Sequence, residues 1–264
     1  MATAGYQRLP EAWKVTLDRP LTTDEIYRAI HKGGGRKAPG RDGISNEFFK
    51  TNLEGLKEEM LEIFTQMLAE QKLTELQKRG VIVCIPKSDK AVAPDDYRPI
   101  TLLNSDYKIL ARIVEGRIRP ALVEVLHACQ HCGVPGKSIF DAVATVRDAV
   151  AYAEMANAPL CVLSLDFKEA FDKISHEYLF TILQSYGFSD ALLRCIENMY
   201  TNATSVVHIN GHISGPIPIQ SSIRQGCPLS IRVMPKSPVV PTGPNAQWPS
   251  YPSAATAIGS NSLC

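Results

Sequence analysis

The sequence lacks the features by which a membrane or secreted protein is usually recognised. It has no run of about eighteen apolar residues, the length that a membrane-spanning helix needs. Residues 1–14 hold no apolar segment of the kind that a secretory signal carries. The seven cysteines are odd in number and scattered, which is typical of reduced thiols rather than of a disulfide framework. We therefore expect a cytoplasmic or nuclear protein without a membrane partner.

A surplus of charge of either sign is also lacking. The 264 residues include 28 Lys and Arg and 27 Asp and Glu, so the formal net charge is +1. Composition alone therefore does not indicate a nucleic-acid partner, and any such argument must rest on where the cations lie. Apolar residues make up 45% of the chain, enough to bury a sizeable core in one large or two small domains.

Acidic residues are absent from the last stretch of the chain. Residues 231–264 hold six of the eighteen prolines and no Asp or Glu. Neither the helical nor the strand period of apolar residues can be drawn through them. We expect a proline-rich disordered tail over 231–264.

Upstream of that tail, apolar periodicity and turn signals predict a mixture of helices and strands. Thr22 or Thr23 is placed to cap a helix through DEIYRAI, and Ser138 with Asp141 forms a capping box for another. Asn210-Gly211 is the residue pair of a type I′ hairpin turn. Further helices are expected from residue 56, over 107–118 and 121–130 with Pro120 as the break, and over 173–187 and 189–200; strands are expected over 81–86 and 159–167. The fold class is α+β.

Two groups of cations stand out in this pattern. Arg36, Lys37 and Arg41 lie among the glycines of a loop, GGGRKAPGRDG, whose backbone amides could face an anion. The alternative is an ordinary solvated loop. Lys87 follows the strand at 81–86, and Arg98 follows the next turn, so the two could clamp a triphosphate. The residues alone do not decide either case.

The stretch LSLDFKEAFDKISH, 163–176, ends an apolar strand-like run in Asp166. A carboxylate at the end of a rigid strand is well placed to bind Mg²⁺, which prefers hard oxygen ligands. The alternative is that the stretch simply begins an amphipathic helix. Asp172 fits that second description, because a carboxylate in the first turn is favoured by the helix dipole.

Taken together and in order, these segments resemble the reverse transcriptases of non-LTR (LINE-type) retrotransposons. The ordered set is KAPGRDGISNEFFK, VIVCIPKSDK, DDYRPITLLNSDYKILARIVEGRI, CGVPGKSIFDAV, LSLDFKEAFDKISHEYL and SIRQGCPLS. The resemblance implies a right-hand polymerase fold. It divides the chain into a lead-in at 1–20, a fingers-like region at 21–160, a partial palm at 161–230 and the unrelated tail at 231–264.

The resemblance also implies roles for single residues. Asp166 matches the first catalytic aspartate, a Mg²⁺ ligand, and the backbone carbonyl of Phe167 matches the neighbouring metal contact. Phe171 matches the residue whose ring excludes a ribose 2′-OH and so selects dNTPs. The implied chemistry is attack by a primer 3′-OH on the α-phosphate of a dNTP, with pyrophosphate as the leaving group. The implied partners are an RNA template and a DNA primer.

The remaining site residues follow from the same resemblance. Lys87 and Arg98 match the residues that grip the dNTP triphosphate, and Gln225 and Gly226 match the loop that packs against the templating base pair and the incoming nucleotide. The basic loop of Arg36, Lys37 and Arg41 is the candidate nucleic-acid contact. The sequence leaves the oligomeric state open.

The sequence departs from the family after SIRQGCPLS. Family members carry two further catalytic aspartates in an x-Asp-Asp hairpin, whereas the one Asp-Asp pair here, Asp95-Asp96, lies upstream. Neither that hairpin nor a thumb can be found in the 264 residues. We expect a truncated reverse transcriptase that is inactive as an enzyme. A non-catalytic RNA- or DNA-binding module and a product without function are the alternatives.

Overall fold

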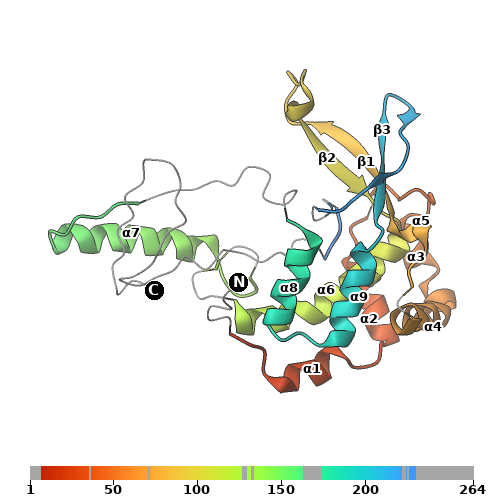
Figure 1. The fold of residues 1–264 in the computed structure, drawn as a ribbon, viewed down its shortest axis with the longest axis horizontal. Helices are drawn as coiled ribbons and strands as arrows, with labels where there is room; N and C mark the ends of the chain where they lie inside the picture. The colour runs from red at the N-terminus through yellow and green to blue at the C-terminus, as the bar shows by residue number, and fades with distance from the viewer. Residues whose placement is uncertain are drawn as a thin grey trace. The chain divides into compact units, whose positions relative to one another are not determined.

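The computed structural model describes residues 7–35, 37–70, 72–126, 130–131, 134–162, 174–221, 224 and 226–229. These residues form a mixed α+β structure, as the sequence predicted (Figure 1). Helices are α1 (Glu11–Leu17), α2 (Thr23–Lys32), α3 (Asn46–Thr51), α4 (Leu53–Glu70), α5 (Glu75–Lys78), η1 (Pro94–Asp96), α6 (Ser105–Val125), α7 (Ile139–Met155), α8 (His176–Ser185) and α9 (Asp190–Tyr200); strands are β1 (Arg79–Pro86), β2 (Tyr97–Leu102), β3 (Thr204–Ile209), β4 (His212–Ile213) and β5 (Ile217–Pro218). Within these ranges no helix is long and apolar enough to cross a membrane.

The chain divides into two compact units. The first comprises residues 1–125 and 169–234, and the second comprises 126–168 and 235–264. The described part of the second unit is α7 with its flanks. A capping box between Ser138 and Asp141 begins α7, as predicted from the sequence.

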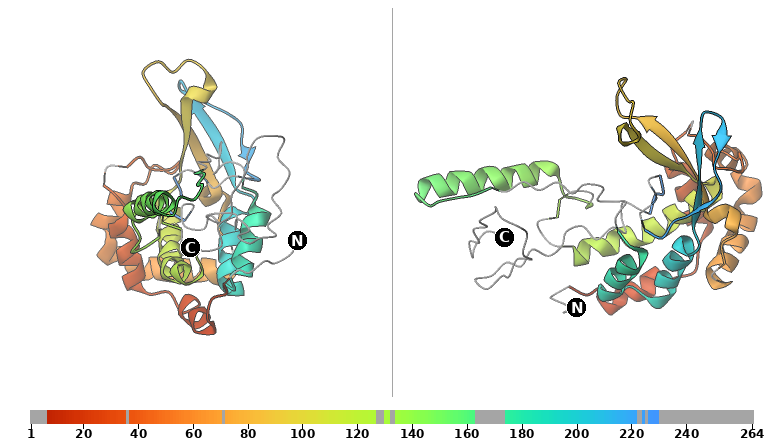
Figure 2. Two further views of the ribbon diagram at one scale, coloured as in Figure 1. Left: turned by 90° about the vertical axis from the view of Figure 1, so that its left-hand side faces the viewer. Right: turned by 45° about the horizontal axis from the view of Figure 1, so that its top comes forward.

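The sheet of the first unit has the strand order β2-β1-β3-β4, with β5 also paired to β3. β1 is antiparallel to β2 and parallel to β3. The predicted hairpin is confirmed: β3 and β4 are antiparallel, and Asn210 and Gly211 between them have φ values of 52° and 79°. In two further views the strands stay together and the helices of this unit lie at one end of them (Figure 2).

The core of the first unit is built around α6. α6 contacts α2, α1 and α5. The fully buried apolar side chains of the unit come from α2, α6, α8 and α9 and include Ile26, Ile30, Tyr107, Ile109, Leu110, Ile118, Leu179, Leu183, Ile196 and Tyr200. Thr22, one of the two caps that the sequence predicted, begins α2 and forms a capping box with Glu25.

The predicted break at Pro120 is wrong, because α6 runs through it from Ser105 to Val125. Proline removes one backbone hydrogen bond and normally ends a helix. Here Ala121, Leu122 and Val125, beyond the proline, are buried like Ile118 before it. Tertiary packing on both sides therefore keeps the helix continuous.

The strand expected over 159–167 is not found over its described part. Residues 159–162 carry no regular secondary structure, and Leu160 and Val162 are exposed. The rest of that stretch, residues 163–167, lies outside the described residues.

Candidate nucleotide and nucleic-acid interface

The β1–β2 hairpin positions Lys87 directly after β1. The backbone N–H of Lys87 donates to the Asp96 carbonyl at 2.8 Å, which extends the antiparallel ladder by one residue. Its Nζ donates to the Asp95 carbonyl at 2.6 Å. The ammonium group is thus held at the turn of the hairpin, on an exposed side chain.

Asp96 stabilises the turn itself. Its Oδ2 accepts hydrogen bonds from the backbone N–H groups of Val92, at 3.0 Å, and Ala93, at 2.9 Å. These two bonds lower the pKa of the Asp96 carboxyl below its usual value. The carboxylate therefore stays ionised and folds the turn back onto the end of β1.

Arg98 lies on the same face of the hairpin as Lys87. It is the cross-strand partner of Ile85, and directly opposed residues share a face. Lys87 is two residues beyond Ile85, which places it on that face too. Arg98 is exposed and has no hydrogen-bond or ion-pair partner among the described residues. The hairpin thus presents two cations together, as a clamp for an anion requires; their role remains a prediction.

The glycine-rich loop is docked onto the start of α6. A Cβ on Gly40 would lie 2.4 Å from the backbone nitrogen of Asn104, so only glycine fits there. Ser105 Oγ donates to the Ile44 carbonyl at 2.7 Å. The Asp42 side chain accepts from the Ile44 N–H at 3.0 Å. The glycine at position 40 therefore serves close packing rather than an anion.

The cations of this loop remain accessible. Lys37 and Arg41 are exposed. Burial lowers the pKa of Lys108 at the start of α6, and the charges of Arg112 and Lys37 lower it further. Positive charge therefore gathers where the loop meets α6. Arg36 lies outside the described residues.

Arg224 is a buried anchor that the sequence reasoning missed. Only 2% of it is exposed. Its guanidinium donates to the carbonyls of Lys78 and Met199, each at 2.9 Å, and to the hydroxyl of Tyr107. It also lies 4.7 Å from the centre of the Tyr107 ring. Arg224 therefore ties its own segment to the ends of α5 and α9 and to α6.

Gly226 fixes the same segment against β2. Its φ is +118°, and a Cβ there would lie 2.4 Å from the Thr101 carbonyl oxygen. Gln225 lies outside the described residues, between the two anchored positions of Arg224 and Gly226. The only sequence signal for the anchor is the arginine preceding this glycine, and nothing in the sequence indicates that the arginine is buried.

The candidate residues fall into two groups at different points along β2. Arg98 is three residues before Thr101, which corresponds to roughly 10 Å of strand. Lys87 and Arg98 form one group near the turn. Gly226, against Thr101, and the loop that contains Gly40, against Asn104, lie near the helical end.

The predicted catalytic and metal residues Asp166 and Phe167, and the predicted sugar gate Phe171, lie outside the described residues. Across the described ranges, no three His, Cys, Asp or Glu side chains gather as a metal site needs. The Mg²⁺ prediction therefore continues to rest on the sequence of the stretch at 163–176.

The chain matches a family model described as reverse transcriptase (RNA-dependent DNA polymerase) over residues 85–234. It is 34% identical to the transposon TX1 uncharacterized 149 kDa protein of Xenopus laevis over 86% of this chain and 17% of that protein. It is 26% identical to a retrovirus-related Pol polyprotein of element R2 from Popillia japonica, over 80% of this chain and 29% of that protein. It is likewise 26% identical to the RNA-directed DNA polymerase from mobile element jockey of Drosophila melanogaster, over 79% of this chain and 23% of that protein. The chain thus spans less than a third of the length of these relatives.

Proposed function

The chain belongs to the reverse transcriptase family and is of retrotransposon origin, and from this premise we propose that it binds a deoxynucleoside triphosphate and a nucleic-acid strand. The observation that carries the proposal is the β1–β2 hairpin, which presents Lys87 and Arg98 on one exposed face. Both residues lie in the part of the chain that the family model matches. Two cations from adjacent strands can contact different phosphates of one triphosphate.

In this proposal Gly226 and Gln225 contact the nascent base pair, while Asp166 and the Phe167 carbonyl hold Mg²⁺. Mg²⁺ held there would supply positive charge to balance the charge that develops on a phosphoryl group during transfer. The Phe171 ring excludes a ribose 2′-OH. The partners are an RNA template and a DNA primer.

We propose in addition that a polypeptide of these 264 residues does not polymerise nucleotides. Phosphoryl transfer with two metal ions needs more than one carboxylate. The last Asp or Glu in the sequence is Glu197, so no acidic side chain follows Gly226 to join Asp166. We therefore expect this chain to bind a nucleotide and a nucleic-acid strand without polymerising nucleotides.

Replacing Lys87 or Arg98 with alanine is expected to weaken dNTP binding about tenfold each, because each change removes one charge-assisted contact to a phosphate oxygen. Isothermal titration with a dNTP and Mg²⁺ measures the effect. Lys90→Ala is the matched control, since Lys90 is exposed in the same turn. Equal affinities in all four proteins would contradict the clamp.

Nucleic-acid binding without any nucleotide site is the second candidate, favoured by the exposed Lys37 and Arg41 of the docked loop. In that case RNA affinity should fall with salt, and the double variant Lys37→Gln, Arg41→Gln should reduce the slope of log K against log[salt] by about 1.4. Fluorescence anisotropy with a labelled RNA measures this slope. No binding at low salt would exclude this candidate.

A further inference from the structure

A second cationic site lies between α2 and α6, away from the hairpin turn that carries Lys87 and Arg98 (Figure 1). It is a cavity of about 320 Å³, at the lower end of the range for small-ligand pockets. Of its nine lining residues, five are Arg or Lys and one is Glu. The basic residues are Arg19 before α2, Arg28 and Lys32 on α2, and Arg112 and Arg119 on α6.

The basic residues are brought together by helical spacing. Arg28 and Lys32 are four residues apart on α2, and Arg112 and Arg119 are seven apart on α6, so each pair shares one face of its helix. The two faces meet across the cavity. The surface therefore depends on the packing of α2 against α6, not on any contiguous basic segment.

Gly116 lines the cavity without a side chain to fill it. It lies in the interior of α6, where glycine is less favourable than alanine. A Cβ at this position would meet no atom within 4 Å, so packing does not require glycine here. The position lines the cavity, and a larger side chain there would occupy it.

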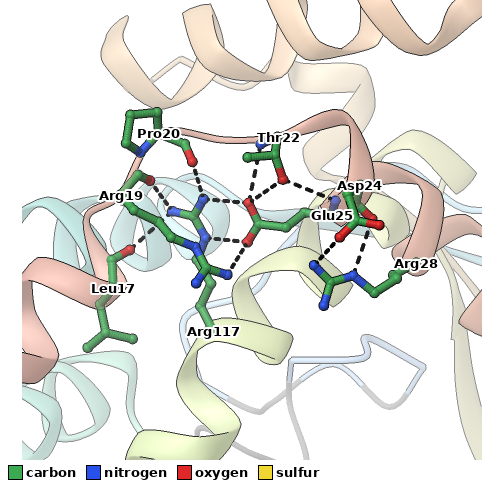
Figure 3. A network of polar contacts seen from close by, with 8 residues as sticks. All are labelled: Leu17, Arg19, Pro20, Thr22, Asp24, Glu25, Arg28 and Arg117. Carbon is green, nitrogen blue, oxygen red and sulfur yellow. Dashed lines mark hydrogen bonds and ion pairs between the residues drawn. The ribbon is translucent and has the colours of Figure 1, made fainter.

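The carboxylates near the cavity are already shared between cations. Glu25 accepts from Arg117 at 2.8 Å and from Arg19 at 3.2 Å (Figure 3). Glu115 pairs with Lys32 and with Arg119. Burial alone would raise the pKa of both carboxyls, yet their cationic partners outweigh it and lower both pKa values. Both carboxylates therefore stay ionised, and each is already paired with two cations.

Positive charge remains in excess even with these pairs in place. The five lining cations and Arg117 face three carboxylates, Asp24, Glu25 and Glu115, which leaves three positive charges unbalanced.

Arg112 pairs with no carboxylate in the described ranges: its Nη1 donates to the Ala29 carbonyl and to Asn46 Oδ1, at 3.1 and 3.0 Å. Its Nε and Nη2 make no hydrogen bond to the described residues. The guanidinium thus retains donors and a charge that an anion can satisfy.

We propose that the α2–α6 cavity binds a phosphate group of a nucleic-acid backbone through Arg112, Arg119 and Arg28. A free phosphate ion presents the same oxyanion chemistry. A backbone phosphate is favoured because the cavity belongs to the unit that contains most of the family-matched residues. The choice of a nucleic-acid backbone as the origin of the phosphate group rests on the proposed function; the phosphate site itself does not.

The test compares the full chain with Gly116→Gln, which fills the cavity, and Arg112→Gln, which removes one cation. Arg194→Gln is the matched control, since Arg194 is an exposed arginine on α9. Gly116→Ala is a control for the helix itself: it should raise the melting temperature, because alanine favours the helix and its Cβ meets no atom within 4 Å.

The first readout is the melting temperature in inorganic phosphate against chloride at matched ionic strength. Phosphate is expected to raise it in wild type and Arg194→Gln, and not in the two cavity variants. A phosphate effect that survives in both Gly116→Gln and Arg112→Gln, or that is absent from wild type, would overturn the site.

The second readout is the affinity for a labelled single-stranded RNA, which should fall about tenfold in each cavity variant. If the cavity variants lose the phosphate effect but keep the RNA affinity of the wild type, the ligand of the cavity is a free phosphate ion and not a nucleic-acid backbone. Failure of the hairpin clamp is separable, because Lys87→Ala and Arg98→Ala leave the cavity intact.

Discussion

Replacing Arg224 with leucine is expected to lower the free energy of unfolding by about 3 kcal/mol. The change removes the guanidinium donor from the carbonyls of Lys78 and Met199 and from the Tyr107 hydroxyl. Among the described residues, the Met199 carbonyl then keeps only the hydrogen bond from the Tyr107 hydroxyl, at 3.4 Å. Each unsatisfied buried group costs about 1–3 kcal/mol, and loss of a buried charge offsets part of the sum. Burial raises the pKa of Tyr107 well above its usual value, so its hydroxyl stays protonated in this buried site.

Equilibrium unfolding in urea, followed by circular dichroism, measures this change. The control is Arg194→Leu, an exposed arginine on α9, which should change the free energy of unfolding by less than about 0.5 kcal/mol. Arg224→Lys should recover only part of the loss, because one ammonium group does not reproduce the planar fork of a guanidinium. Equal stabilities of Arg224→Leu and the control would show that the segment before Gly226 is not anchored as described.

Replacing Glu25 with alanine is expected to destabilise the fold by about 3–5 kcal/mol, because Arg117 would then be buried without its carboxylate. The side chains of Glu25 and Arg117 are only 8% and 9% exposed. Arg117 also donates to the carbonyls of Leu17, Arg19 and Pro20, so it holds the segment before α2 onto α6 (Figure 3). The same change removes the capping box of α2.

Asp24→Ala is the matched control for Glu25. Asp24 is the neighbouring carboxylate, but its ion pair with Arg28 is exposed, and such pairs contribute about 0–1 kcal/mol. Urea unfolding of the two variants should therefore differ by several kcal/mol. A similar small loss in both would contradict the buried network.

The Glu25 network also gives a direction of pH dependence. The folded-state pKa of Glu25 is lowered from 4.5, so its stabilisation is present above that unfolded-state value and is lost as the pH falls through the folded value. Glu115 shifts in the same direction. Acid should therefore destabilise the wild type below about pH 4.5 more than it destabilises Glu25→Gln.

Local features of this fold could be predicted from the sequence because their causes are local. The helix caps at Thr22 and Ser138 each depend on a hydroxyl residue and on an acidic residue three positions later. The hairpin depends on Asn210-Gly211 and on the β-rich segments on either side of this pair. The continuation of α6 through Pro120 could not be predicted, because it depends on packing by residues distant in the sequence.

The same distinction applies to the candidate sites. Lys87 and Arg98 could be proposed from the sequence because they flank one strand and one turn. The cross-strand register places both on one face, and their role stays a prediction. Arg224 and the α2–α6 cavity were missed, because burial and the meeting of two helix faces leave no local pattern. The family membership was predicted correctly, since an ordered set of short segments is specific even where each segment is not.

We propose that this chain binds a nucleotide and a nucleic-acid strand, and that a polypeptide of these 264 residues does not polymerise nucleotides. Primer extension on an RNA template with dNTPs and Mg²⁺ tests it most directly. We predict no incorporation above background by the wild type, and the same background by Asp166→Ala. Robust incorporation by the wild type that Asp166→Ala abolishes would contradict the claim.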